Sequence, residues 1–150
     1  MIIFSLLVAN SLQAQKLYVY RQELKAGTIK SFVDEKGNET HSKASDFIYL
    51  VYLQTTRSPV VKELWIDGNQ FEFKIDSIST PVVLKTGVKF NHQQKTDTLV
   101  KKTSEKVYRI IPGKKISDST GKNSRGVILV IKGKKLKQPK IKDLPPVYNQ

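Results

Sequence analysis

The residues with the clearest chemical potential are six lysines that lie close together near the end of the chain. Each ammonium group attracts anions, and side chains at every second position of a strand share a face, so these lysines would form a linear basic stripe. Such a stripe suits an anionic glycan, lipopolysaccharide, an anionic lipid or an acidic protein. The candidate binding residues are Lys132, Lys134, Lys135, Lys137, Lys140 and Lys142.

A second interpretation of the same lysines is structural. Lysine on the edge strand of a sheet prevents that edge from pairing with another chain, and the sequence favours this role over binding. The charge is nevertheless uneven: residues 76–150 contain 17 Lys/Arg and five Asp/Glu, whereas residues 1–75 contain nine and eight. Nucleic acid is not expected, because its recognition uses arginine forks and exposed aromatic rings, and only Arg125 accompanies the lysines.

The chain lacks the residue patterns of common catalytic and metal sites. It has no cysteine, which excludes disulfides, zinc–thiolate sites, iron–sulfur clusters and thiol catalysis. Its two histidines, His41 and His92, lie in polar stretches without metal-ligand spacing and are expected to be solvated. No Gly-x-Ser-x-Gly motif or phosphate-binding loop is present. We therefore expect no catalytic residues, metal or cofactor, and a hydrolase is the least favoured alternative.

The first fourteen residues predict export. An apolar run at residues 2–9 is followed by polar Asn10 and Ser11 and then by Leu-Gln-Ala, which is typical of a secretory signal peptide. The run is too short to cross a membrane as a helix. Cleavage would follow Ala14 or Ser11, and the alternative is a buried N-terminal strand. The expected location is the periplasm, the outer membrane surface or the extracellular space, without a transmembrane segment.

The elements that must position any site are strands, and residues 60–75 show this most clearly. Apolar and polar residues alternate on both sides of Asp67-Gly68-Asn69, a sequence that supplies the positive φ angles of a tight hairpin turn. We therefore predict a β-hairpin here. Because it contains Trp65, the only tryptophan, we expect that ring to be buried in the core.

The rest of the chain repeats this pattern of short strands and turns, with no sustained helical periodicity. In the first strand, Leu17, Val19 and Arg21 would share one side. The sequence predicts one all-β domain over residues 15–150, an antiparallel immunoglobulin-like β-sandwich of about eight or nine short strands. A polar loop is expected at residues 114–126, and Pro145-Pro146 leads to the end of the chain. The expected strands are residues 16–24, 28–33, 46–55, 60–66, 70–75, 81–90, 96–102, 106–111 and 126–132, followed by a lysine-rich edge segment at 135–141.

Two stretches of the chain are similar at an offset of 65 residues. Residues 64–71 (LWIDGNQF) resemble residues 129–136 (LVIKGKKL). An internal duplication would explain this similarity, and so would two unrelated hairpins with the same turn chemistry.

In its signal-like start and its lysine-rich, cysteine-free β pattern, the chain resembles small exported proteins of Gram-negative bacteria, a resemblance that implies no particular activity. The expected function is that of a non-catalytic exported binding module whose partner is a protein or an anionic envelope component. The alternative is a binder of anionic glycan, lipopolysaccharide or lipid through the lysine-rich half.

Overall fold

The computed structural model describes residues 15–26, 31–33, 36–37, 39–41, 45–90, 93–117, 125–132 and 134–149. The secondary structure in these ranges consists of β-strands, as the alternating pattern predicts. The strands are β1 (Lys16–Ala26), β2 (Ser31–Val33), β3 (Glu39–His41), β4 (Ser45–Thr55), β5 (Val61–Ile66), β6 (Asn69–Ile78), β7 (Val82–Phe90), β8 (Gln93–Val100), β9 (Lys106–Ser117), β10 (Val127–Ile131), β11 (Lys134–Gln138) and β12 (Lys142–Asn149).

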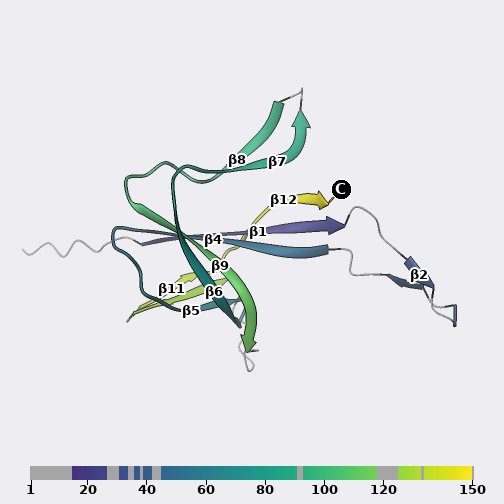
Figure 1. Cartoon of the computed structure of the whole chain (residues 1–150), viewed down its shortest axis with the longest axis horizontal. Helices are drawn as coiled ribbons and strands as arrows, with labels where there is room; N and C mark the ends of the chain where they lie inside the picture. Colours follow the sequence, from purple (N-terminus) through teal and green to yellow (C-terminus); the bar gives the residue numbers. More distant parts are fainter. Residues whose placement is uncertain are drawn as a thin grey trace, which may run out of the picture.

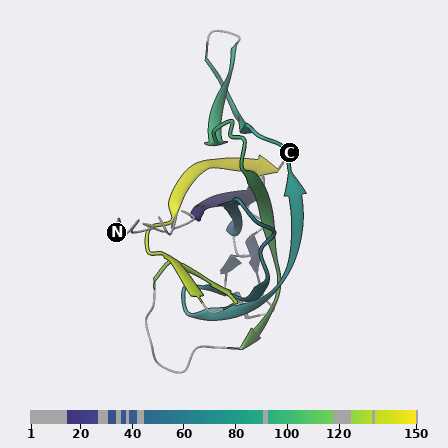
Figure 2. The ribbon, with the colours of Figure 1, turned by 90° about the vertical axis from the view of Figure 1, so that its left-hand side faces the viewer.

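Eight of the strands form one sheet that curls round until its two edges approach each other (Figures 1 and 2). The strand order is β11-β10-β5-β6-β9-β4-β1-β12, so consecutive strands β11 and β12 lie at opposite edges. Only residues 139–141 connect them, and three residues can span little more than about 10 Å. The curl makes this connection possible. Where the edges meet, Gln138 Nε2 donates a hydrogen bond of 3.2 Å to the carbonyl oxygen of Leu17.

The inner face of the curled sheet holds the main hydrophobic core. Buried aliphatic side chains from five strands pack against one another there, among them Val51, Leu53, Leu64, Ile110 and Leu129, each at most 1 % exposed. Alternate residues of each strand point inward, because successive side chains of a strand face opposite sides. This alternation explains why apolar residues at every second position predict the strands well.

A second, smaller core lies on the outer face of β1 and β4. Tyr20 and Tyr52 pack there with their ring centroids 6.5 Å apart, and Leu99 and Val100 near the base of the β7–β8 hairpin cover them. The Tyr20 hydroxyl donates a hydrogen bond to the carbonyl oxygen of Leu99. Burial raises the pKa of both phenols. The apolar run of β4 from Leu50 to Leu53 is therefore explained by burial on both of its faces, whereas Phe47 and Ile48 before it are exposed.

The predicted hairpin at residues 60–75 is confirmed, but the expected position of Trp65 is wrong. Ile66 pairs with Asn69 across the two-residue turn, and Asp67 and Gly68 have φ angles of 46° and 81°. Leu64 and Ile66 point into the core, so Trp65 faces the other side of the sheet and is half-buried. Its Nε1 donates a hydrogen bond of 2.8 Å to Glu63 Oε2.

The all-β prediction is confirmed, but a purely antiparallel sheet is wrong because β12 pairs with β1 in parallel. The immunoglobulin-like sandwich is not confirmed, since eight strands belong to one curled sheet. The sequence analysis missed β12 because of Pro145 and Pro146, which cannot donate ladder hydrogen bonds. They lie at a bulge in the edge strand, opposite the interval between Gln22 and Leu24, where Gln22 Nε2 donates to the Pro145 carbonyl.

The predicted loop at residues 114–126 is partly wrong, because β9 continues to Ser117 and stays paired with β6 there, with two shifts of register. Most of the remaining loop, residues 118–124, lies outside the described residues. The signal peptide proposed for residues 1–14 also lies outside them, so it stays a prediction.

The two similar stretches of sequence form two adjacent hairpins, β5–β6 and β10–β11. They share one register, with Leu64 opposite Phe71 in the first and Leu129 opposite Leu136 in the second. Leu64 also pairs directly with Leu129 between the hairpins, so a local twofold relation passes through that pair. This arrangement fits duplication and convergent turn chemistry equally well.

Candidate functional site

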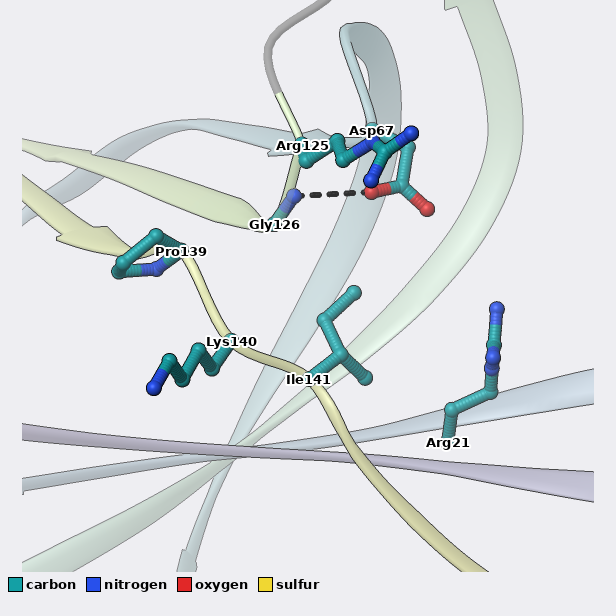
Figure 3. Close-up of a pocket in the computed structure, with 7 residues that line it drawn as sticks. All are labelled: Arg21, Asp67, Arg125, Gly126, Pro139, Lys140 and Ile141. Carbon is teal, nitrogen blue, oxygen red and sulfur yellow. Dashed lines mark hydrogen bonds between the residues drawn. The ribbon is translucent and has the colours of Figure 1, made fainter.

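A polar cleft of about 800 Å³ lies at one end of the curled sheet, where four segments distant in sequence come together (Figure 3). They are β1, the β5–β6 turn, the start of β10 and the connection between β11 and β12. The apolar inner face gives way to charged groups here. On β1, for example, buried Val19 is followed two residues later by Arg21. The lining residues are Arg21, Asp67, Arg125, Gly126, Pro139, Lys140 and Ile141.

Asp67 and Gly126 join the β5–β6 turn to the start of β10. The Asp67 backbone N–H donates a hydrogen bond of 2.8 Å to the Gly126 carbonyl oxygen. In return, the Gly126 N–H donates one of 2.8 Å to Asp67 Oδ1. Gly126 has a φ of +95°, and a Cβ atom there would lie 2.2 Å from the carbonyl oxygen of Gln138. The close approach of these segments therefore requires glycine.

Arg21 is held in place by groups from both neighbouring strands. Its Nε donates a hydrogen bond of 2.7 Å to Asp143 Oδ1 on β12, and its guanidinium carbon lies 4.9 Å from the ring centroid of Phe47 on β4. The hydrogen bond to Asp143 raises the pKa of Arg21 and lowers the pKa of Asp143. Such contacts restrict the arginine before any ligand arrives.

Tyr49 on β4 connects Arg21 with Asp67. It lies opposite Arg21 in the β1–β4 pairing and interacts with the side chains of both Arg21 and Asp67. Burial, reinforced by the nearby Asp67 carboxylate, raises the pKa of the Tyr49 phenol, while Arg21 opposes this rise. The phenol therefore stays protonated at neutral pH and can only exchange hydrogen bonds with these neighbours.

The charges around the cleft favour an anion. Arg21, Arg125 and Lys140 carry three positive charges against the single carboxylate of Asp67 among the lining residues. Figure 3 shows Arg125 beside Asp67, Arg21 pointing upward from below them, Ile141 to the left of Arg21, and Lys140 pointing away to the other side. Guanidinium groups bind carboxylate and phosphate oxygens through paired hydrogen bonds, so this end of the cleft can hold an anionic group.

The structure distributes the six lysines proposed from sequence rather than gathering them into one site. All six are exposed. Lys135 and Lys137 alternate with half-buried Leu136 on β11, at one edge of the sheet, whereas Lys142 begins β12 at the opposite edge. Only Lys140 lines the cleft. The remaining two, Lys132 and Lys134, lie at the tip of the β10–β11 hairpin.

Arg21 and Asp67 were not identified as site residues from the sequence, and Arg125 was noted only as a neighbour of the lysines. A usable signal was present, because the chain has 22 lysines and only four arginines. Two of the four arginines line the polar cleft, and a third, Arg109, lines a smaller apolar one. Three of the four arginines therefore line a cleft, so in this chain arginine indicates the clefts better than lysine does.

Other kinds of site were also considered. Within the described ranges, no three or more His, Asp or Glu side chains are grouped as a metal site would need. His41 belongs to β3, and His92 lies outside those ranges. The described part of the chain contains no helix that is long and apolar enough to cross a membrane. Comparison of the chain with known protein families, curated proteins and solved structures gives no match.

Proposed function

We propose that the protein is a non-catalytic binding module that holds an anionic ligand, most simply a carboxylated glycan, in the cleft between β1, the β5–β6 turn and β10. The observation that carries this proposal is that Arg21 and Arg125, which are distant in the sequence, both line one cleft. The volume of about 800 Å³ falls within the range of about 300–1,000 Å³ that is usual for ligand pockets.

The contacts around Arg21 support binding rather than a purely structural ion pair. Arg21 uses Nε for Asp143, places its guanidinium over Phe47 and interacts with Tyr49, so the plane of the guanidinium is fixed at the cleft. A planar, pre-oriented fork loses little entropy when a carboxylate binds. Pro139 and Ile141 add apolar surface beside the cations, which suits the faces of a sugar ring.

Location outside the cytoplasm belongs to the same proposal. The signal-like residues 1–14 support export to the periplasm, the outer membrane surface or the medium, where acidic glycans and lipopolysaccharide are available as ligands. N-terminal sequencing of the protein from its native host should give a mature chain that starts after Ser11 or Ala14. Mature protein that retains Met1 would contradict export.

The binding proposal is tested with a carboxylated oligosaccharide, trigalacturonate, by isothermal titration calorimetry. Arg125→Gln removes one guanidinium from the cleft, and Lys135→Gln removes the same charge from β11, outside the cleft. A charged hydrogen-bond pair contributes about 1.5–3 kcal/mol, so Arg125→Gln should weaken binding roughly tenfold or more. Lys135→Gln should change the dissociation constant less than about twofold at about 0.15 M salt, where screening reduces distant charges.

Equal effects of Arg125→Gln and Lys135→Gln would contradict a cleft site and would favour a diffuse attraction to the whole basic surface. The fully methyl-esterified trisaccharide serves as the neutral control, because it keeps the sugar rings and lacks the carboxylates. If this neutral ligand bound as tightly as trigalacturonate, the cations would have no role in recognition.

A further inference from the structure

Three connections between strands and the start of β1 lie together at one end of the curled sheet, which we call the basic end. The start of β1 pairs with the end of β4, and Thr55 at the end of β4 lies opposite Lys106 at the start of β9. The Lys132 N–H of the β10–β11 turn donates to the carbonyl oxygen of Val60, between β4 and β5. Figure 1 shows these segments on its left-hand side, and Figure 2 looks onto them. The basic end consists of Lys16, residues 55–62, residues 101–106, Lys132 and Lys134.

The basic end carries eight exposed cations and a single carboxylate. That carboxylate, Glu105, accepts a hydrogen bond of 2.6 Å from Gln54 Nε2, so it is directed toward β4. Within the described ranges, no ion pair involves any of the eight cations. Their charge is therefore not neutralised by neighbouring carboxylates. The cations are Lys16, Arg57, Lys62, Lys101, Lys102, Lys106, Lys132 and Lys134.

The connection between β4 and β5 presents an apolar side chain among these cations. Tyr108 Oη donates a hydrogen bond of 3.2 Å to Ser58 Oγ on one side of the connection. On the other side, the carbonyl oxygen of Val60 accepts the bond of 3.2 Å from the Lys132 N–H. The backbone is thus held, while the Val60 side chain remains 52 % exposed. An apolar side chain surrounded by lysines can enter hydrocarbon while the ammonium groups stay at a charged surface.

The kind and the spread of these charges indicate the partner. Seven of the eight cations are lysines, which act as point charges and lack the paired donors with which arginine recognises a single anionic group. None of them lines either cleft. An anionic lipid surface attracts every cation within about one screening length of it, and so suits charges that are spread over an open surface. A soluble polyanion would meet the same charges but would offer no hydrocarbon to Val60.

We propose that the basic end docks on the surface of an anionic lipid bilayer. Its lysines contact the headgroup phosphates, and Val60 enters the boundary between the headgroups and the acyl chains. Six of the eight cations lie outside the lysine stripe considered from the sequence, so this surface draws on both halves of the chain. The polar cleft is elsewhere, since Asp67 follows the opposite end of β5. Lipid docking therefore does not depend on the ligand proposed for that cleft.

Sedimentation of the full chain with lipid vesicles tests this proposal. The anionic vesicles contain equal parts of phosphatidylcholine and phosphatidylglycerol, and vesicles of phosphatidylcholine alone are the neutral control. At about 0.15 M salt, the protein should bind the anionic vesicles at least about tenfold more tightly than the neutral ones. Binding should weaken as the salt concentration rises, because screening shortens the range of the attraction.

Two double variants locate the charges that bind lipid. Lys101→Gln with Lys102→Gln removes two charges from the basic end, and Lys114→Gln with Lys115→Gln removes two from the far part of β9. Lys115 lies about 30 Å along the strand from Lys106, well beyond the screening length of about 8 Å. Each cation near an anionic surface contributes about fivefold in affinity. The first variant should therefore weaken vesicle binding at least about tenfold, and the second less than about twofold.

Substitutions of Val60 test contact with hydrocarbon. Val60→Asn should weaken binding to the anionic vesicles at least about threefold, because it replaces an apolar side chain with a polar one. Ile116→Asn is its control, since Ile116 is 57 % exposed near the far end of β9, and it should leave binding unchanged. Val60→Trp places a fluorophore at the docking surface, and its emission should shift to shorter wavelength on anionic vesicles. The wild-type emission, from Trp65, should not shift. Thermal melts confirm that each variant is folded.

Several results would overturn lipid docking. They are absence of binding to the anionic vesicles, equal binding to the neutral ones, and equal losses in the two double-lysine variants. If Val60→Asn bound as the wild type does and the emission of Val60→Trp stayed unshifted, the occupant would be a soluble polyanion instead. Arg125→Gln should leave vesicle binding unchanged, whereas it should weaken trigalacturonate binding. The two sites can therefore fail independently.

Discussion

The β5–β6 and β10–β11 hairpins have the same register and pair with each other through β5 and β10, yet the two ends of this unit differ. At both ends, a turn of one hairpin donates to the base of the other: Asp67 N–H to the Gly126 carbonyl at 2.8 Å, and Lys132 N–H to the Val60 carbonyl at 3.2 Å. Only the first end has a carboxylate that accepts a bond in return. Gly126 is buried there, whereas Val60 is 52 % exposed.

The polar cleft lies at the first of these ends. Gly126 allows the backbone at Gln138 to come within contact distance, and Asp67 fixes the turn above it. Together they position Arg125, immediately before Gly126, across from Arg21. At the other end, Lys132 and Val60 occupy the positions that correspond to Asp67 and Gly126.

The largest expected change in the free energy of unfolding comes from replacing Gly126. Gly126→Ala introduces a Cβ into a backbone with a φ of +95°, 2.2 Å from the Gln138 carbonyl oxygen. Strain and a backbone clash together should lower the free energy of unfolding by about 4 kcal/mol or more. Val60→Ala, at the corresponding end, should change it by less than about 0.5 kcal/mol. Urea denaturation measures both, and similar losses would remove the distinction between the two ends.

A smaller difference in the free energy of unfolding is expected between substitutions on the two faces of β5. Leu64 is 0 % exposed and pairs with Leu129 at the centre of the unit, so Leu64→Ala should cost about 3 kcal/mol. Trp65 is half-buried on the opposite face, and Trp65→Ala should cost about 1 kcal/mol. The same denaturation experiment compares them. A larger loss for Trp65→Ala than for Leu64→Ala would contradict the orientation of β5 described above.

The smallest changes in stability and in trigalacturonate affinity are expected from substitutions on β11. Replacement of Lys134, Lys135 and Lys137 together by Gln removes three exposed charges from an edge strand. Surface changes of this kind should alter the free energy of unfolding by less than about 0.5 kcal/mol each. Trigalacturonate affinity should fall less than about threefold at about 0.15 M salt. If the triple variant lost as much trigalacturonate affinity as Arg125→Gln, the lysines of β11 would be the binding residues instead.

The sequence predicts the local elements of this fold well, because they depend on local patterns. Alternating apolar residues identify β5 and β6, and Asp67-Gly68 identifies the turn between them. The order of the strands in the sheet depends instead on contacts between distant segments, which no local pattern records. β12 illustrates this limit, since Pro145 and Pro146 argue against a strand until a bulge opposite the interval between Gln22 and Leu24 accommodates them.

The site was less predictable for the same reason. Arg21 could be placed on the same side of its strand as Leu17 and Val19, and therefore at the end of an apolar face. That it meets Asp67 and Arg125 follows only from the curl of the sheet, which brings β1 close to the β10–β11 hairpin. The density of lysines drew attention to β11, whereas the scarcity of arginine was the more informative signal.

The central claim is that an anionic ligand binds between Arg21 and Arg125, and chemical-shift mapping by nuclear magnetic resonance tests it most directly. Titration of the isotope-labelled protein with trigalacturonate should shift the amide signals of Asp67 and Gly126, because their hydrogen-bonded pair lies in the wall of the cleft. The amides of Lys135 and Lys137 should remain unshifted. Shifts confined to β11, with Asp67 and Gly126 unchanged, would contradict the account.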